Sequence, residues 1–231
     1  GLGLGFMAMI QIAATPSNES LQQMTELLET LPPFMLEMFG AGDTAFLATT
    51  EGYLALQLFA VFPLILAFYG VTCGMNVVSN EEERGIMDSL LSMPIERWKV
   101  VLEKCAAYAL TISGVVAMIF AGVWIGILIT PSMASVNVTN MLWAHVGMIP
   151  VTWGVFAFTV LTTGLLRRRG LALTLAAVFV LGSYFLDTLG KASPGTILGT
   201  LRPLSVNAWY DYQSILQNAM IWGNLLVLVL A

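Results

Sequence analysis

Long apolar runs set the pattern of this chain. They cover about residues 1–14, 53–78, 105–129, 141–166 and 170–186, and a last run begins near residue 219. Residues 53–79, 105–130 and 170–186 contain no charged side chain. Because a helix that crosses a bilayer needs roughly 20 apolar residues, the pattern predicts an all-α polytopic membrane protein with six transmembrane helices. We expect one transmembrane domain over residues 1–231 that lacks flanking sequence at both ends.

The composition agrees with a membrane protein. Of the 231 residues, 58% are hydrophobic and 10% are charged, and the mean hydropathy is +0.83. A soluble domain carries about 25% charged residues, so a water-soluble fold is excluded. The sequence has no basic arm and no mixture of basic and aromatic residues suited to nucleic acid. Cys73 and Cys105 lie outside any CxxC or Cys/His spacing, so we predict neither a metal site nor a disulfide.

The basic residues define the orientation in the membrane. Seven of the nine lie in two connections, namely Arg84, Arg97, Lys99, Lys104, Arg167, Arg168 and Arg169. Short loops rich in Lys and Arg stay in the cytoplasm, so the loop of residues 80–104 is predicted to be cytoplasmic. Residues 15–52, 131–140 and 188–217 are then predicted to lie on the outer side.

Two of the outer connections have the pattern of membrane-surface segments. In residues 20–31, apolar side chains recur at helical spacing on one face, and polar side chains fill the other. Residues 188–217 mix Trp209, Tyr210 and Tyr212 with polar groups. Because amphipathic helices and amphipathic aromatic rings lie at the membrane surface, we predict outer interfacial segments at residues 15–52 and 188–217 that contact lipid.

The loop of residues 80–104 holds ten of the 23 charged residues. A charge at the bilayer centre costs roughly 2.5–3.5 kcal/mol, so this loop is predicted to lie at the cytoplasmic surface. Asn80 and Glu83 have the spacing of a capping box, and acidic residues are favoured in the first turn of a helix. Pro94 ends that predicted helix because proline lacks an N–H. A second helix is predicted to start near Ile95 and to run into the third span.

These residues resemble the first cytoplasmic loop of the ABC-2 type transporter permeases. The resemblance rests on an acidic pair before Arg-Gly, a further acidic residue, a Leu pair, a proline, a basic residue and a closing lysine, at Glu81, Glu83, Arg84, Gly85, Asp88, Leu90, Leu91, Pro94, Ile95, Arg97, Trp98 and Lys104. Two positions depart from the family pattern. Ile86 stands where Thr is usual, and Glu96 stands where a small polar residue is common.

The resemblance implies a permease subunit of an ATP-driven ABC exporter in a prokaryotic plasma membrane. Residues 81–92 would form a coupling helix that docks on a separate ABC ATPase subunit, and a second permease subunit, identical or different, would complete the pathway. The implied ATPase-docking residues are Glu81, Glu82, Glu83, Arg84, Gly85, Ile86, Asp88, Leu90, Leu91 and Pro94. The implied transmission into the third span runs through Ile95, Arg97, Trp98 and Lys104.

We expect no cofactor and no ATP hydrolysis in this chain itself. The phosphate-binding pattern GxxxxGK[ST] is absent, because Phe185 stands where the first glycine before Gly190 and Lys191 would be. ATP and Mg²⁺ are expected in the partner subunit. An apolar or amphipathic cargo is expected, because the second and fifth spans carry aromatic residues that suggest its lining, namely Phe62, Phe68, Phe179, Tyr184 and Phe185.

Two polar residues near the outer side are open to more than one interpretation. His145 could hold a proton or cargo, but a satisfied interfacial histidine is favoured because the fourth span has no acidic residue. Asp187 is expected to be solvated where the fifth span ends. The GxxxG pairs of the second and third spans favour packing within the chain over a dimer contact.

Two other functional classes are weighed against an exporter. A proton- or ion-coupled secondary transporter usually places ionisable groups in mid-membrane, and here the spans offer only His145 near one end. A non-transporting anchor or assembly subunit of a larger complex stays an alternative, because a docking helix can recruit any partner. Co-purification of a soluble ATPase distinguishes these classes.

Overall fold

The computed structural model describes residues 1–13, 49–83, 97–133, 135–166 and 168–217, with the single positions 23, 26, 27, 30, 32, 35, 36 and 46. Within these ranges all regular structure is helical. The elements are α1 (Leu2–Ala13), α5 (Thr50–Leu54), the π-helix η1 (Ala55–Phe59), α6 (Phe62–Glu83), α8 (Arg97–Ile129), η2 (Pro131–Met133), α9 (Val138–Leu165), α10 (Arg169–Ala192), α11 (Ile197–Leu201), η3 (Arg202–Leu204), η4 (Val206–Trp209) and α12 (Tyr212–Leu216).

Four helical segments are long and apolar enough to cross a membrane, which confirms the predicted class. They are Thr50–Val77, Trp98–Ile129, Val138–Leu165 and Arg169–Ala192, with 28, 32, 28 and 24 residues. They match the second to fifth predicted spans. The count of six is not confirmed, because α1 has only 12 residues and the last predicted span, from residue 219, lies outside the described residues. The predicted helix over residues 20–31 also lies outside them, apart from isolated positions.

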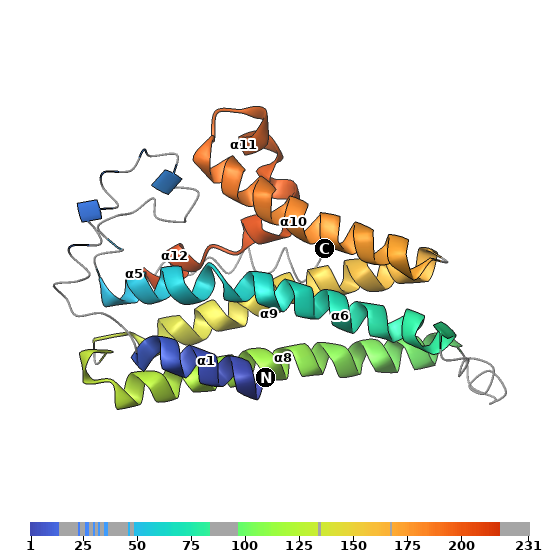
Figure 1. The fold of residues 1–231 in the computed structure, drawn as a ribbon, viewed down its shortest axis with the longest axis horizontal. Coiled ribbons are helices and arrows are strands. Elements are labelled where there is room, and N and C mark those ends of the chain that lie inside the picture. The colour runs from blue at the N-terminus through green and yellow to red at the C-terminus, as the bar shows by residue number, and fades with distance from the viewer. Residues whose placement is uncertain are drawn as a thin grey trace.

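The four long helices run alternately up and down beside one another (Figure 1). The helix ends that flank the α6–α8 and α9–α10 connections lie at one end of the bundle, η2 lies at the other, and α11 lies beyond the far end of the tilted α10. This arrangement agrees with the predicted orientation, in which the first two connections are cytoplasmic. Helix α1 lies along α8 and runs in the same direction as α8 (Figure 1).

Two glycines of α8 allow α1 to approach closely. A Cβ on Gly122 would collide with the carbonyl oxygen of Gly5, and a Cβ on Gly126 would lie 3.0 Å from the Cβ of Ile12. Small residues at such positions let helix backbones approach within a membrane. The pair at residues 122 and 126 therefore packs within the chain, as predicted.

The other glycine pair joins α6 to α9. A Cβ on Gly70 would lie 3.1 Å from the carbonyl oxygen of Thr152, and one on Gly74 would lie 2.6 Å from the Cβ of Thr159. The hydroxyls of Thr152 and Thr159 donate to carbonyl oxygens of their own helix, both at 2.8 Å. These threonines can therefore be buried at the seam without an unpaired hydroxyl, and packing within the chain is confirmed for this pair as well.

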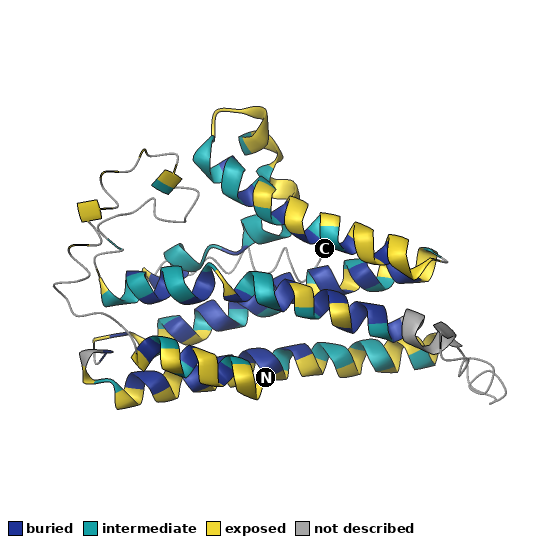
Figure 2. Cartoon of the chain, viewed as in Figure 1, coloured by how far each residue is buried: buried dark blue, intermediate teal, exposed yellow. Residues whose placement is uncertain are grey.

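The buried residues lie where the helices face one another, and α10 contributes the least to them (Figure 2). The largest core cluster joins α1, η1, α6, α8 and α9 and includes Ile12, Phe59, Phe62, Ile119 and Met141. Helix α10 buries one narrow stripe and exposes apolar side chains on both sides of it. The stripe consists of Ala172, Ala176, Val180, Ser183, Asp187 and Gly190.

Replacing Gly122 with alanine should separate α1 from α8. The added methyl has no space against the Gly5 carbonyl, and overpacking of this kind costs about 1–3 kcal/mol. We expect a lower thermal unfolding midpoint in lipid nanodiscs. The matched control is Gly114→Ala in the same helix, where a Cβ meets nothing within 4 Å. Equal unfolding midpoints for the two variants would contradict the α1–α8 seam.

Candidate functional site

Most of the predicted docking segment lies outside the described residues. This holds for Arg84, Gly85, Ile86, Asp88, Leu90, Leu91, Pro94 and Ile95. The backbone of Glu81, Glu82 and Glu83 forms the last turn of α6. The prediction that a separate helix begins at Asn80 is therefore wrong. The three glutamates lie at the C-terminal end of a helix that continues from the second span, and not in the first turn of a new one.

The transmission residues that are described lie at the start of α8. This helix begins at Arg97 and has 33 residues, which corresponds to a length of about 50 Å. Trp98 is 58% exposed, and the Nζ atom of Lys99 lies 5.5 Å from the centroid of its ring. The prediction of one helix that runs through Trp98 and Lys104 into the third span is confirmed. Because the hydrocarbon layer is about 30 Å thick, α8 is long enough to extend beyond it.

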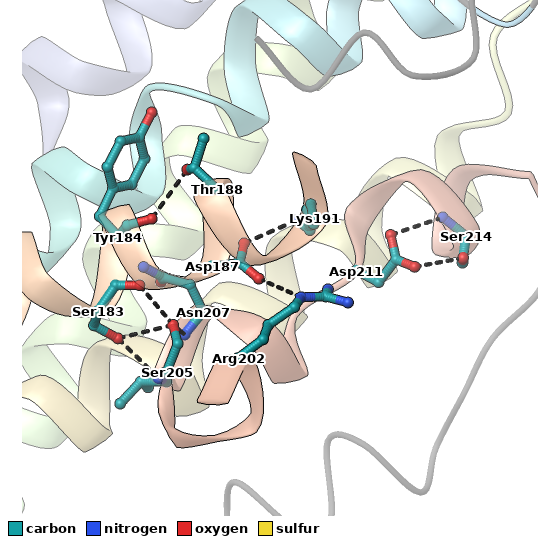
Figure 3. Close-up of polar contacts among 11 residues, drawn as sticks. Ser183, Tyr184, Asp187, Thr188, Lys191, Arg202, Ser205, Asn207, Asp211 and Ser214 are labelled. Carbon is teal, nitrogen blue, oxygen red and sulfur yellow. Dashed lines mark hydrogen bonds and ion pairs between the residues drawn. The ribbon is translucent and has the colours of Figure 1, made fainter. Parts of the chain in front are cut away.

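At the other end of the bundle, Asp187 of α10 is the centre of an ion-pair cluster (Figure 3). Its Oδ1 accepts from Nε of Arg202 at 2.9 Å, and its Oδ2 lies 2.9 Å from Nζ of Lys191. Asp187 is only 7% exposed, so the expectation of a solvated carboxylate is wrong. Gly190 makes room for this pairing, since a Cβ there would lie 2.9 Å from the Cβ of Arg202.

Two buried serines make a second connection between α10 and the segment that follows it (Figure 3). The hydroxyl of Ser205 donates to the carbonyl of Ser183 at 2.7 Å, and the amide of Val206 donates to Oγ of Ser183 at 2.8 Å. Oγ of Ser205 also accepts from the amide of Asn207 at 3.1 Å. These bonds cap the start of η4 and join it to α10, since the amides of Val206 and Asn207 belong to the first turn of η4.

Tyrosines and an asparagine fasten the same outer segment to α9. The hydroxyl of Tyr210 donates to the carbonyl of Ala144 at 2.8 Å, and Nδ2 of Asn140 donates to the carbonyl of Leu216 at 3.0 Å. Burial raises the pKa of Tyr210 well above its usual value. Burial, and then the neighbouring Asp211 carboxylate, raises the pKa of Tyr212 to about 12. Both phenols therefore stay protonated at physiological pH, and the Tyr210 bond persists.

His145 lies two turns inside α9 and is 1% exposed. Its Nδ1 lies 2.7 Å from the carbonyl oxygen of Met141, whereas its Nε2 is buried without a hydrogen-bond partner. The rings of Phe59 and Phe120 meet the imidazole edge-on, with centroids 5.0 and 5.5 Å away. The expected satisfied interfacial histidine is thus wrong on two counts, since the side chain is buried and only half paired.

The aromatic residues proposed to line a pathway divide into two groups. Phe62 is 1% exposed and belongs to the core, and Phe179 stacks on Phe158 of α9 with centroids 3.9 Å apart. Phe68 and Phe185 are 44% and 56% exposed, respectively. Tyr184 is half-buried and contacts the ring of Phe185 edge-on, with centroids 5.9 Å apart. Phe68 and Phe185 therefore stay candidates for contact with a cargo, a second subunit or lipid, whereas Phe62 and Phe179 do not.

The polar contacts of the described residues join helices to one another, and these residues show no candidate metal site. Across them, no group of three or more His, Cys, Asp or Glu side chains could hold a metal ion. Cys73 and Cys105 are free thiols that pack in one apolar cluster of α6, α8 and α9. Sequence reasoning missed the Asp187–Arg202 and Ser183–Ser205 pairs. A sequence signal could have suggested the ion pair, because Asp187 ends a span and is followed by Lys191 and Arg202, the two basic residues outside the predicted cytoplasmic loops.

Comparison with known proteins gives one match. A family described as multidrug efflux system permease Rv1217c, C-terminal domain, matches residues 2–230. No curated protein matches the chain, and no solved structure matches it.

Replacing Arg202 with glutamine should loosen the outer segment, because it removes the ionic contact that joins η3 to α10. A hydrogen bond to a charged group contributes about 1.5–3 kcal/mol, so amide hydrogen exchange over residues 197–209 should accelerate at least fivefold. Lys191→Gln is the matched control, since Lys191 and Asp187 lie on the same helix. Equal acceleration in both variants would show that Arg202 does not hold this segment.

Proposed function

The chain belongs to the multidrug efflux permease family whose model covers residues 2–230, and we propose further that it is the transmembrane subunit of an ATP-driven exporter of the ABC-2 type. The family and the four apolar helices make it a transport permease of the membrane. The ATP coupling and the ABC-2 assignment are parts of the proposal. They rest on the resemblance of residues 81–104 to the coupling loop of ABC-2 permeases.

The observation that carries the proposal is the way two long helices flank this loop. Helix α6 continues through Glu83, six residues beyond the apolar stretch that ends at Val77, and α8 begins at Arg97. Both ends lie on the side predicted to be cytoplasmic (Figure 1). A force on the intervening residues therefore acts on two spans at once. This is what a permease needs in order to receive a stroke from a soluble motor.

In the proposed mechanism the work of ATP is done in another subunit. Residues 81–92 dock on an ABC ATPase subunit, which holds ATP and Mg²⁺. Closure of two such ATPases moves two docked permease chains relative to each other. The chain passes the motion into α8 through residues 95–104 and into α6 through Glu81, Glu82 and Glu83. The cargo then moves outward between the two permease subunits.

The proposed cargo is apolar or amphipathic. Helix α10 exposes both sides of its buried stripe, including Leu175, Val178 and Phe185, and α6 exposes Phe68. These faces are the described surfaces of the second and fifth predicted spans that remain open to a partner subunit or a cargo. An apolar lining would favour compounds that partition from the bilayer, in keeping with the efflux function of the family.

Replacing Ile86 and Leu90 together with serine should abolish co-purification of an ATPase subunit that carries a phosphate-binding GxxxxGK[ST] motif. Ile86 and Leu90 are four residues apart and so form an apolar stripe on one face of the predicted coupling helix. The change removes this stripe, which a partner groove would bury at about 1.5–3 kcal/mol per side chain. The control is Ile197→Ser with Leu204→Ser, which makes the same kind of change at exposed outer residues. Retained ATPase in the first variant refutes docking through this stripe.

Replacing Pro94 with alanine tests how the stroke is transmitted. Alanine restores a backbone donor and permits a continuous helix from the docking residues into α8. We expect the ATPase to stay bound and to hydrolyse ATP, while efflux of a fluorescent amphipathic dye falls at least several-fold. Normal efflux by this variant would mean that Pro94 only stops a helix.

A further inference from the structure

His145 is the single histidine of the chain, and it lies at a junction of several elements. Phe59 of η1 contacts one part of its ring and Phe120 of α8 contacts another. Phe59 also stacks on Tyr212 of α12, with centroids 5.8 Å apart. The imidazole on α9 therefore contacts η1 and α8 directly and α12 through Phe59.

The hydrogen bonds define the protonation state of this imidazole. The carbonyl of Met141 can only accept a hydrogen bond, so Nδ1, at 2.7 Å, must carry the proton. Nε2 then presents a lone pair, and no donor of the described residues hydrogen-bonds to it. A second proton at Nε2 would create a cation between two phenylalanine rings without an acceptor. Burial of an unpaired charge of this kind is strongly unfavourable.

No ionised partner compensates for such a charge among the described neighbours. Helices α1 and α9 carry no other ionisable side chain, and those of α8 lie between Arg97 and Tyr108, three turns or more from Phe120. Glu51 of α5 accepts from the amide of Asn137, Asp211 binds Ser214, and Tyr210 donates to Ala144. The remaining titratable groups of the packed elements are Tyr53, Tyr69, Cys73, Tyr212 and, in the last turn of α6, Glu81, Glu82 and Glu83. These glutamates follow Phe59 by more than 20 residues of helix, at the opposite end of α6.

The segment that covers His145 has an irregular helical backbone. Phe59 ends the π-helix η1, which interrupts the helical span between α5 and α6. Single π-helical turns are rare and occur frequently at functional sites. His145 lies eight residues after the N-cap Asn137, or about 12 Å from the outer end of α9. If η1 moved away from α9, water from the outer side would reach Nε2.

We propose that His145 is a proton-binding site that couples acidity on the outer side to separation of η1 and α8 from α9. When η1 and α8 pack against α9, Nε2 of His145 cannot take up a second proton. When they separate from α9, water hydrates the doubly protonated ring. Protons therefore bind preferentially to the separated form, and by linkage acid must increase its population. For a single group the separated-to-packed ratio rises at most about tenfold per pH unit. The site is independent of the ATPase-docking proposal and would regulate the outer side of the pathway.

The test uses the full chain in lipid nanodiscs, with ¹⁵N-labelled histidine and one spin label at the exposed Leu142 of α9, paired in turn with a label at Val61 beside η1 or at Leu128 of α8. Cys73 and Cys105 are replaced by alanine and serine so that the labels are unique. At pH 7.5 we expect one imidazole signal with the proton on Nδ1 and a short label distance. Between pH 7 and 5 the signal of the doubly protonated ring and a longer label distance should appear together.

His145→Asn is the decisive variant, because its amide can still donate to the Met141 carbonyl but cannot titrate. Its label distance should be independent of pH. The proposal is overturned if the distance change persists in this variant, if the wild-type ring stays singly protonated down to pH 5, or if it gains a proton without a distance change. The last two outcomes are read from the unsubstituted histidine, so they hold even if the asparagine variant does not fold.

Discussion

Lipid tails are as apolar as the side chains of these helices, so the bilayer supplies little hydrophobic force to press one helix against another. What holds this bundle together is the close approach of backbones. Gly122 and Gly126 bring α8 against α1, and Gly70 and Gly74 bring α6 against α9. Dispersion contacts at such seams are individually small but numerous. The largest core cluster, around Ile12, Phe59 and Ile119, lies between elements that these two seams have already aligned.

The outer segment depends on a second constraint, the need to pair every buried polar group. Residues 193–217 return to the spans in short helices, whose terminal backbone groups cannot all bond within the helix. Side chains of the spans satisfy some of them, as Ser183 does for Val206 and Asn140 does for Leu216. Asp187 anchors the start of this return through Arg202. Among the described residues, three buried polar atoms lack a partner, namely Oε1 of Gln11, Oε1 of Gln57 and Nε2 of His145. Such exceptions are uncommon enough in native proteins to mark sites of interest, and of these three only His145 can titrate near neutral pH.

The four long spans were predictable from the sequence because the length of an apolar run is a local property. The role of the glycine pairs was also predictable, since their spacing alone places them on one helix face. The helix start predicted at Asn80 was wrong. A capping pattern favours a helix start, but it does not stop a helix that continues through it from the preceding span, as α6 does. The surroundings of Asp187 and His145 could not be inferred for a different reason. Arg202, Phe59 and Phe120 reach them only after the chain has folded back, and no spacing along the sequence records that return.

The length of α8 has a consequence for how motion is amplified. A rigid rod of 33 residues is about 50 Å long, so a rotation of about 5° about one end displaces the other by about 4 Å. Because α1 is seated on its outer half through Gly122 and Gly126, the two helices swing as one lever arm. A small rotation of α8 about its start at Trp98 therefore becomes a shift of atomic dimensions at Ile129, and the glycine seam makes α1 move with it.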